Sequence, residues 1–304
     1  MGFSDTWSAK GFSLDPAAPR TGPFPKRAFL ETWWRHRGPA DDARPAFLEN
    51  DTALLTLVED GATIRFCGPA HLTDYHSPLG TGTPDLIAQS GRSAFRARRL
   101  ALNSLPAEAA AEITAGLASA GIPALSTTSE LTAVLTLPAT SDAWLAAMRK
   151  KDRHELRRKV RRFTQEHGSP ELVRGADDPA FDEFVALHRR APGEKGEFMT
   201  DRMAAFFRSL VAEAGAVLDL LIAGGQAYAA AFGFEDERGY YAYNAAYDPS
   251  AAPSSPGIVL HAAIVNAQIE RGGSFIDFLK GAEAYKFRLG AQPRPLYRIE
   301  SEIV

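Results

Sequence analysis

Four charged side chains stand close together in residues 274–290, SFIDFLKGAEAYKFRLG, where one short apolar run would otherwise read as buried strand. They are Asp277, Lys280, Glu283 and Lys286. A packed core does not need them, because a buried charge without a partner costs several kcal/mol. The four residues therefore form either a solvated rim or a site. In a site, the ammonium of Lys286 would stabilise a developing anion or hold a phosphate, whereas in a rim it would form an ordinary helix pair with Glu283.

A second concentration of charge lies in residues 149–162, which contain nine Lys or Arg against two acids, Asp152 and Glu155. The chain as a whole carries a formal net charge of -3. A general affinity for nucleic acid is therefore not expected, but a local surface for phosphates is. The alternative is a solvated helix face, and the sequence leaves both open.

Other signals are weaker. His71, Asp74 and His76 have a spacing that suits a metal ion, but no third histidine or cysteine cluster supports them, so no metal is expected. A single cysteine, Cys67, excludes an internal disulfide and fits a reducing compartment. It stands in an apparent strand, TIRFCGP, which favours a buried and inert thiol.

Length and composition set the frame for these residues. With 304 residues, 45% of them hydrophobic and 23% charged, the chain is expected to be a globular protein of two domains. No apolar run is long enough to span a bilayer, and no signal-peptide segment is found, so a cytoplasmic location is expected. Residues 1–25 are expected to be a loosely packed tail, followed by domains over residues 26–138 and 139–304.

The elements that position the charged residues follow a regular order in the second half. A long helix is expected from Ser141 to Gly168, with two amphipathic helices after it. Residues 216–250 then predict an antiparallel meander of three strands, because turn residues separate their apolar runs. A further helix starts at Ser255, where a serine cap precedes a proline. The strand and short helix of residues 274–290 and a final strand complete the order.

This order resembles the acetyltransferase fold of the GNAT superfamily. Four stretches resemble one branch of it, the BioF2-like, CelD-like acyltransferases, which are related to the FemAB peptidoglycan aminoacyltransferases: MRKKDRHELRRKVRRF, LHRRAPGEKGEF, YAYNAAYDPSAAPSSPGIVLHAAI and FIDFLKGAEAYKFRLGA. A further stretch, LTDYHSPLG, resembles an N-terminal element of the same branch. The resemblance implies a mixed α/β fold with tandem GNAT-like domains, complete over residues 139–304 and degenerate over residues 26–138.

The resemblance also implies where an acyl donor binds. In the superfamily the donor's phosphates rest on the N–H groups that begin the helix after the fourth strand. In this chain Ser255, Pro256 and Gly257 stand there, and Lys280 is expected beside them. The Gln/Arg-x-x-Gly-x-Gly/Ala loop of acetyl-CoA binders is absent, and Pro256 has no N–H to offer.

Catalytic and acceptor residues follow from the same resemblance. Many relatives have a late helix, Phe-Tyr-x-x-x-Gly, whose tyrosine protonates the leaving thiolate. Matched at Gly290, this chain has Lys286 in the tyrosine's place, with Tyr285 just before it and Asp277 on the preceding strand. The expected substrate-binding residues are Asp74, Tyr75, His188, Lys195, Tyr243 and Asn244.

The sequence thus predicts an N-acyltransferase that transfers an acyl group from acetyl-CoA or another acyl-CoA to an amine bound between the two domains. The amine is a small molecule or a precursor of the cell envelope. One alternative is a FemAB-like enzyme that takes an aminoacyl-tRNA, with the basic run 149–162 as its tRNA surface. A second alternative is a non-catalytic accessory protein of polysaccharide or cell-envelope biosynthesis.

Overall fold

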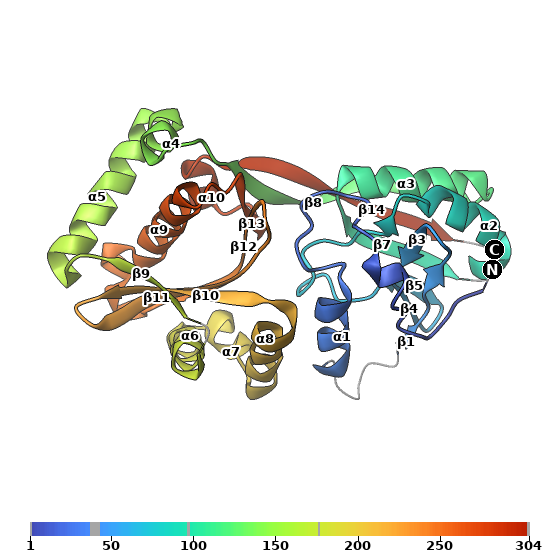
Figure 1. Ribbon diagram of the computed structural model, residues 1–304, viewed down its shortest axis with the longest axis horizontal. Helices are drawn as coiled ribbons and strands as arrows, with labels where there is room; N and C mark the ends of the chain where they lie inside the picture. Colours follow the sequence, from blue (N-terminus) through green and yellow to red (C-terminus); the bar gives the residue numbers. More distant parts are fainter. Residues whose placement is uncertain (1, 37–42, 96–97, 176, 303–304) are drawn as a thin grey trace. The chain divides into compact units, whose positions relative to one another are not determined.

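The computed structural model describes residues 2–36, 43–95, 98–175 and 177–302, which divide into two compact units of mixed α/β structure (Figure 1). The first unit comprises Met1–Leu131 and Arg294–Val304, and the second comprises Thr132–Pro293. The chain from Arg294 onward belongs to the first unit, whereas the sequence predicted residues 139–304 as one domain. Among the described residues, no helix is long and apolar enough to cross a membrane.

The first unit has two groups of strands. Its larger group has the order β1-β4-β5-β7-β14, and its smaller group has the order β2-β3-β6. The strands are β1 (Arg44–Pro45), β2 (Leu48–Glu49), β3 (Ala53–Leu55), β4 (Leu57–Asp60), β5 (Thr63–Phe66), β6 (Leu79–Gly80), β7 (Arg99–Leu105) and β14 (Gln292–Glu302). The helices are η1 (Gly11–Ser13), α1 (Arg27–His36), α2 (Thr83–Phe95) and α3 (Ala107–Ser119). The strand β8 (Leu125–Thr136) runs from this unit into the second.

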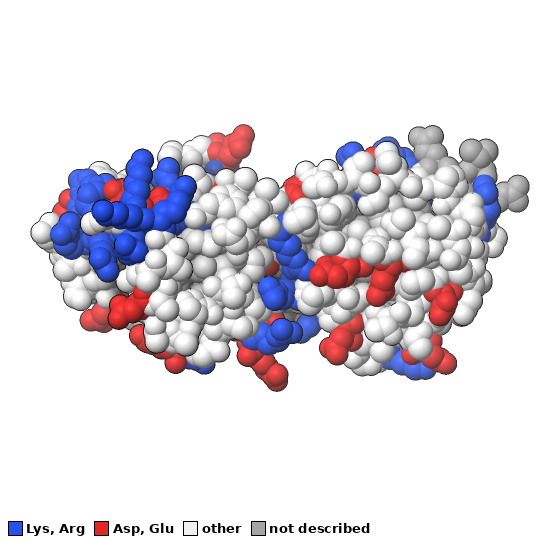
Figure 2. Space-filling model, turned by 90° about the horizontal axis from the view of Figure 1, so that it is seen from above, with Lys and Arg blue, Asp and Glu red and all other residues white. Residues whose placement is uncertain are grey.

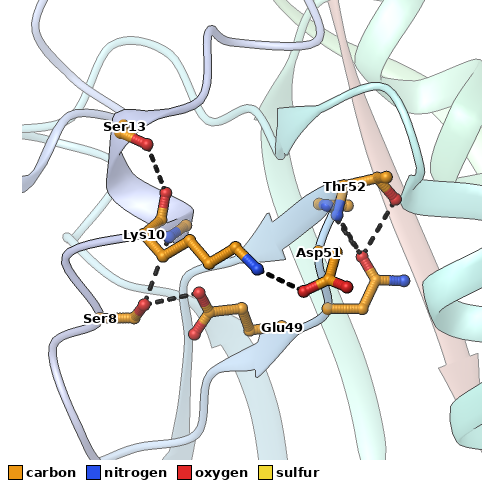
Figure 3. A network of polar contacts seen from close by, with 9 residues as sticks. Ser8, Lys10, Ser13, Glu49, Asp51 and Thr52 are labelled. Carbon is orange, nitrogen blue, oxygen red and sulfur yellow. Dashed lines mark hydrogen bonds and ion pairs between the residues drawn. The ribbon is translucent and has the colours of Figure 1, made fainter.

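The loosely packed tail expected over residues 1–25 is wrong. Phe24 is completely buried, and Trp7 packs with its ring edge against Phe47 at a centroid distance of 5.0 Å. Figure 3 shows the polar side of the same contact, where Ser8 Oγ donates to Glu49 Oε1 at 2.5 Å and Lys10 pairs with Asp51. Proline and glycine content suggested a loose segment, but these aromatic rings bury enough apolar surface to hold it.

The second unit contains the elements expected from the second half of the sequence. Its strands are the end of β8, β9 (Glu171–Gly175), β10 (Ala216–Ala223), β11 (Gln226–Glu235), β12 (Gly239–Tyr247) and β13 (Phe275–Lys280). Its helices are α4 (Ser141–Ala147), α5 (Lys150–His167), α6 (Asp178–Arg190), α7 (Glu194–Phe198), α8 (Asp201–Ala214), η2 (Pro249–Ser254), α9 (Pro256–Glu270) and α10 (Ala284–Arg288). The pairings of β10 with β11 and of β11 with β12 are antiparallel, which confirms the predicted meander.

The single long helix expected from Ser141 to Gly168 is wrong. It breaks at Met148 and Arg149, whose backbone is extended, so that α4 and α5 are separate helices. The Met148 side chain is buried at the break, and Nη1 of Arg153 donates to the carbonyls of the last turn of α4. Tertiary packing and this cap stabilise two helices where the apolar spacing alone predicted one.

Helices cover both faces of the second unit's strands, with α6, α7 and α8 on one side and α5 and α9 on the other (Figure 1). Small residues on β11 allow a helix to pack closely against this strand. Ala229, Ala230 and Ala231 are completely buried, and α9 packs on this strand. The residues that begin α9 and the end of β13 are thereby held by a well-packed core.

Candidate active site

The two parallel strands β12 and β13 stay paired for only a short distance. Their register is Gly239 with Phe275, Tyr240 with Ile276 and Tyr241 with Asp277, and no later residue of the two described strands is paired with the other. We call the unpaired remainders, 242–247 of β12 and 278–280 of β13, the strand fork. Where two parallel strands part, their facing edges no longer pair with each other, so an extended ligand can lie along the edge of β12 in the fork.

A strained turn bends β13 away from β12 at the fork. Leu279 has φ of 57°, a left-handed conformation that leucine rarely adopts, and is buried. The carboxylate of Asp277, itself completely buried, accepts the N–H of Leu279 at 2.8 Å. The expected catalytic residue Asp277 therefore has a visible structural role, because it holds the turn that opens the fork.

Lys286 closes this turn from the other side. Its ammonium Nζ donates to the carbonyl oxygens of Lys280 at 2.6 Å, Gly281 at 3.3 Å and Leu279 at 3.4 Å, and it lies 2.9 Å from Glu283 Oε2. An ammonium has three N–H donors, so these oxygen atoms already occupy all of them. We call this group the Lys286 cluster. Its lysine side chain is 4% exposed, while that of Glu283 is 58% exposed.

The cluster changes the acid–base behaviour of its carboxylate. Burial alone would raise the pKa of Glu283, but the hydrogen bond and the charge of Lys286 outweigh it and lower that pKa below its ordinary value. Glu283 therefore stays ionised at neutral pH. The predicted pair of Glu283 with Lys286 is confirmed. It is more than a surface pair because the lysine is buried among three carbonyls.

The N-terminus of α9 has the features of an anion-binding site. Ser255 precedes it in a left-handed conformation, with φ of 61°, and Pro256 is its first residue. Among the described residues, the N–H of Gly257 has no hydrogen-bond partner. A cation stands beside it, because Nζ of Lys159 on α5 donates to Ser255 Oγ at 3.2 Å. The expected donor residues Ser255, Pro256 and Gly257 thus lie together at a positive helix end.

His188 and Asn244 meet on the side of α6. His188 Nε2 lies 2.5 Å from Asn244 Oδ1, and its Nδ1 lies 3.2 Å from the carbonyl oxygen of Lys195. Burial lowers the pKa of His188, which opposes its protonation. The ring therefore ties β12 at the fork to α7. Of the other acceptor residues expected here, Tyr243 is half-buried and stacks on Phe207.

Two of the predicted acceptor residues, Asp74 and Tyr75, belong to the first unit. Tyr75 is completely buried, with the guanidinium of Arg294 at 5.0 Å from its ring centroid. His76 uses both ring nitrogens on backbone carbonyls, those of residues 103 and 68. Among the described residues no group of His, Cys, Asp or Glu could hold a metal ion.

The basic run predicted from the sequence forms a coherent surface on α5 (Figure 2). A hollow of about 680 Å³ opens along it, and we call this the α5 hollow. Its lining residues are Arg149, Lys151, Asp152, His154, Glu155, Arg158, Arg161 and Arg288. Asp152 pairs with Arg149 and Glu155 pairs with Arg158, and the charge of Arg288 also acts on Glu155, whereas Lys151 and Arg161 have no acidic partner among the described residues. The hollow thus carries unneutralised positive charge.

Sequence reasoning missed one residue near the fork, His261 on α9. Its ring is 6% exposed and stacks on Tyr285 at a centroid distance of 5.1 Å with an interplanar angle of 14°. Burial, and then the charges of Lys286 and Lys195, lower the pKa of His261 to about 4. Burial also raises the pKa of Tyr285. The available signal was a lone histidine in the apolar run GIVLHAAIV, next to a predicted buried stripe.

Comparison with known proteins places the fold. The family model described as an acetyltransferase (GNAT) domain matches residues 150–287. A conserved protein of unknown function from Bacteroides thetaiotaomicron VPI-5482 has a TM-score of 0.64 at 13% identity, over 99% of each chain. FemX has a TM-score of 0.62 at 11% identity, over 95% of this chain and 94% of that chain.

A third solved structure is similar over nearly the whole chain. The C-terminal domain of a putative lysylphosphatidylglycerol synthetase from Agrobacterium fabrum has a TM-score of 0.58 at 16% identity, over 90% of this chain and 91% of that chain. No curated protein matches the sequence. At such identities the likeness shows the fold alone. The mixed α/β fold class expected from the sequence is confirmed, and residues 150–287 are similar to the GNAT acetyltransferase domain that the family model describes.

Proposed function

We propose that the second unit is an N-acyltransferase that moves an acyl group from acyl-CoA to an amine. The observation that carries this proposal is the strand fork, which opens after Tyr241 and Asp277, in the same unit as the positive start of α9. An acyl-CoA carries its acyl group on a long arm that contains amide groups, and its phosphates follow at the other end of that arm. In the proposed complex, backbone groups along the fork bind the amides. A backbone N–H in the first turn of α9 and the neighbouring Lys159 bind the phosphates.

The residues of the chain divide the chemistry between them. Gly257 leaves room for a phosphate at the helix start, because a side chain there would meet only Tyr247, at 3.4 Å from Cδ1. Tyr285 is the candidate proton donor for the leaving sulfur, because burial raises its pKa and the phenol is therefore protonated at neutral pH. A charge-stabilising role for Lys286 stays a prediction, because its donors are occupied in this structure.

The narrower placement among BioF2-like, CelD-like acyltransferases rests on the run FIDFLKGAEAYK and on the start of α9 at Ser255-Pro256-Gly257. We propose an amine acceptor, either a small molecule or an envelope precursor. His188, Lys195 and Asn244 are its candidate contacts, because they meet where β12 leaves β13.

A second candidate is an aminoacyl-tRNA donor, and the α5 hollow favours it. Its exposed cations, Lys151, Arg161 and Arg288, can attract the phosphates of a polyanion larger than CoA. The hollow borders a smaller pocket that reaches Tyr285 and Ile258, so an acyl group on an anion bound there would point toward the same tyrosine.

One assay separates the two donors. The purified protein is mixed with acetyl-CoA and a panel of primary amines, and release of free thiol is followed against a control without protein. In parallel, aminoacyl-tRNA is offered to the same amines and loss of its aminoacyl ester is followed. Amine-dependent thiol release supports the proposal. Ester loss without thiol release supports the second candidate, and neither activity contradicts both.

A further inference from the structure

His261 has a buried imidazole ring that makes no hydrogen bond to a described residue. It lies on the second turn of α9, with its face on Tyr285 and the edge of Phe278 against it at a centroid distance of 5.6 Å. Its Nδ1 is buried and has no hydrogen-bond partner among the described residues. Native proteins pair nearly all buried polar atoms, so an unpaired ring nitrogen here needs a reason.

The missing partner of Nδ1 decides where the ring carries its proton. A buried N–H without an acceptor costs more than a bare lone pair, because orphaned N–H groups are rarer in proteins than underused acceptors. The neutral ring therefore carries its proton on Nε2. Nε2 makes no hydrogen bond to a described residue, and it is not among the buried atoms that lack a partner. It is therefore partly accessible, and its N–H can donate to a ligand.

The ring lies where the two strands part. Phe278, which contacts it, is the first residue of β13 after the last pair of β13 with β12. Tyr285, which stacks on it, lies on α10 directly before Lys286, whose ammonium holds the turn at residues 279–281. His261 therefore stands at the closed end of the fork, next to the proposed proton donor.

The surroundings keep the ring neutral and favour negative charge nearby. Lys286 and Lys195 both act on His261 electrostatically, and among the described residues Glu283 is the carboxylate that acts on Tyr285 and on these lysines. A neutral imidazole can serve as the hydrogen-bond donor to a developing oxyanion. The charges of the two lysines add to the same potential.

We propose that His261 is a catalytic residue of the acyl transfer, whose Nε2–H donates to the carbonyl oxygen of the acyl donor as that oxygen becomes negative. This inference rests on the proposed function. The amine nitrogen attacks the thioester carbon and forms the C–N bond, while the π electrons of the carbonyl move to the oxygen that His261 holds. The C–S bond then breaks, its electron pair leaves with the sulfur, the carbonyl re-forms, and one proton of the amine ends on the sulfur.

Two substitutions separate this role from a structural one. His261→Leu removes the donor and also the unpaired Nδ1, so the variant should fold at least as stably as the parent protein. His261→Gln keeps an N–H at about the reach of Nε2. With acetyl-CoA and hydroxylamine as probes, thiol release is measured for both variants together with the KM for acetyl-CoA and the thermal midpoint.

We expect kcat of His261→Leu to fall on the order of 100-fold, with little change in KM, as for other removed oxyanion donors. His261→Gln should keep kcat within about tenfold of the parent protein. If the parent protein releases thiol and His261→Leu stays within about twofold of it, the inference is overturned while the proposed function stands. If the parent protein itself releases no thiol above the control, the proposed function fails first.

A folding failure of His261→Leu would not end the test. His261→Asn then serves as the comparison, because its amide lies at about the reach of Nδ1 and not of Nε2. Higher turnover of His261→Gln than of His261→Asn supports the inference, and equal turnover overturns it.

Discussion

The second unit has two kinds of positively charged side chain, buried and exposed. The comparison between them distinguishes a charge that stabilises the fold from charges that can bind a ligand. Lys286 is buried, and three carbonyl oxygens and Glu283 surround its ammonium. The cations of α5 are exposed, and Lys151 and Arg161 have no acidic partner among the described residues. A buried charge that is fully paired holds the chain in one conformation, whereas exposed unpaired charge is left to attract a ligand.

The contrast changes what each group should do when it is removed. The Lys286 cluster holds the turn at Leu279 and so sets the strand fork, through which an acyl donor would be bound. The cations Lys151, Arg161 and Arg288 of the α5 hollow are exposed to solvent, so their charges are not needed to hold the fold together. Removing the first should change stability and donor binding, and removing the second should change only the binding of a polyanion.

The largest effect is expected for Lys286→Met. The substitution leaves three carbonyls without their donor and releases the strained turn at Leu279, so the free energy of unfolding should fall by about 3 kcal/mol. Acetyl-CoA affinity and turnover should fall with it. Urea denaturation and titration measure both, with Lys150→Met as the control because Lys150 is exposed on α5.

A different outcome would support a catalytic role for Lys286. If Lys286→Met folds as stably as the parent protein, binds acetyl-CoA equally well and loses only turnover, its ammonium acts on the reacting atoms and not on the turn.

The next effect concerns the α5 hollow. If a tRNA binds there, its affinity should fall steeply with salt, by roughly 0.7 to 0.9 log units per log unit of salt for each phosphate contact. The double variant Lys151→Gln, Arg161→Gln should flatten this dependence. The matched control, Lys150→Gln with Arg157→Gln, removes equal charge from the same helix outside the hollow. Equal effects of the two double variants would show a diffuse helix charge, and no tRNA binding at low salt would end the second candidate function.

A smaller effect is expected from acid. Lys286 lowers the pKa of Glu283 in the folded chain below the ordinary value of 4.5. A depressed carboxyl pKa contributes stability that is present above the unfolded pKa and is lost as pH falls through the folded pKa. Denaturation at pH 7, 4.5 and 3 should therefore show a gap between the parent protein and Glu283→Gln that narrows toward pH 3. A gap that is constant with pH would mean that the carboxylate is not linked to Lys286.

The smallest effect is expected at the paired edge of the α5 hollow. Arg158 pairs with Glu155, but both side chains are substantially exposed, and such pairs add little to stability. Arg158→Gln should leave the thermal midpoint unchanged within error. A clear drop would show that ion pairs hold α5 in place, and the contrast with the Lys286 cluster would disappear.

The sequence predicted the parts of the site that depend on local chemistry. Pro256 marks a helix start by its fixed φ angle, and glycines mark the turns of the meander. The charges of residues 274–290 were recognised as a group for the same reason, because a buried charge always needs a partner. The serine cap predicted at Ser255 is wrong, because Ser255 is in the left-handed conformation and its side chain makes no capping hydrogen bond.

What the sequence could not predict depends on distant partners. The break between α4 and α5 depends on Arg153 reaching back to the carbonyls of α4, and the packing of Trp7 depends on Phe47, far along the chain. The sequence predicted that the ammonium of Lys286 would be available to a transition state. In the structure this ammonium donates to three carbonyls of a turn in which Leu279 has a positive φ angle. Residue propensities do not predict such an angle for leucine.

The central claim is that an acyl donor is held by the start of α9 and the strand fork, and titration of acetyl-CoA into Gly257→Val tests it most directly. A Cβ at residue 257 makes only an ordinary van der Waals contact with Tyr247 in the free protein, so we expect the fold to tolerate the substitution, while the side chain occupies the proposed place of the donor's phosphates. Affinity should fall on the order of tenfold or more, about 1.4 kcal/mol. The control Ala107→Val, in the first turn of α3, should bind as the parent protein does. Equal acetyl-CoA affinity of Gly257→Val and the parent protein would contradict the account.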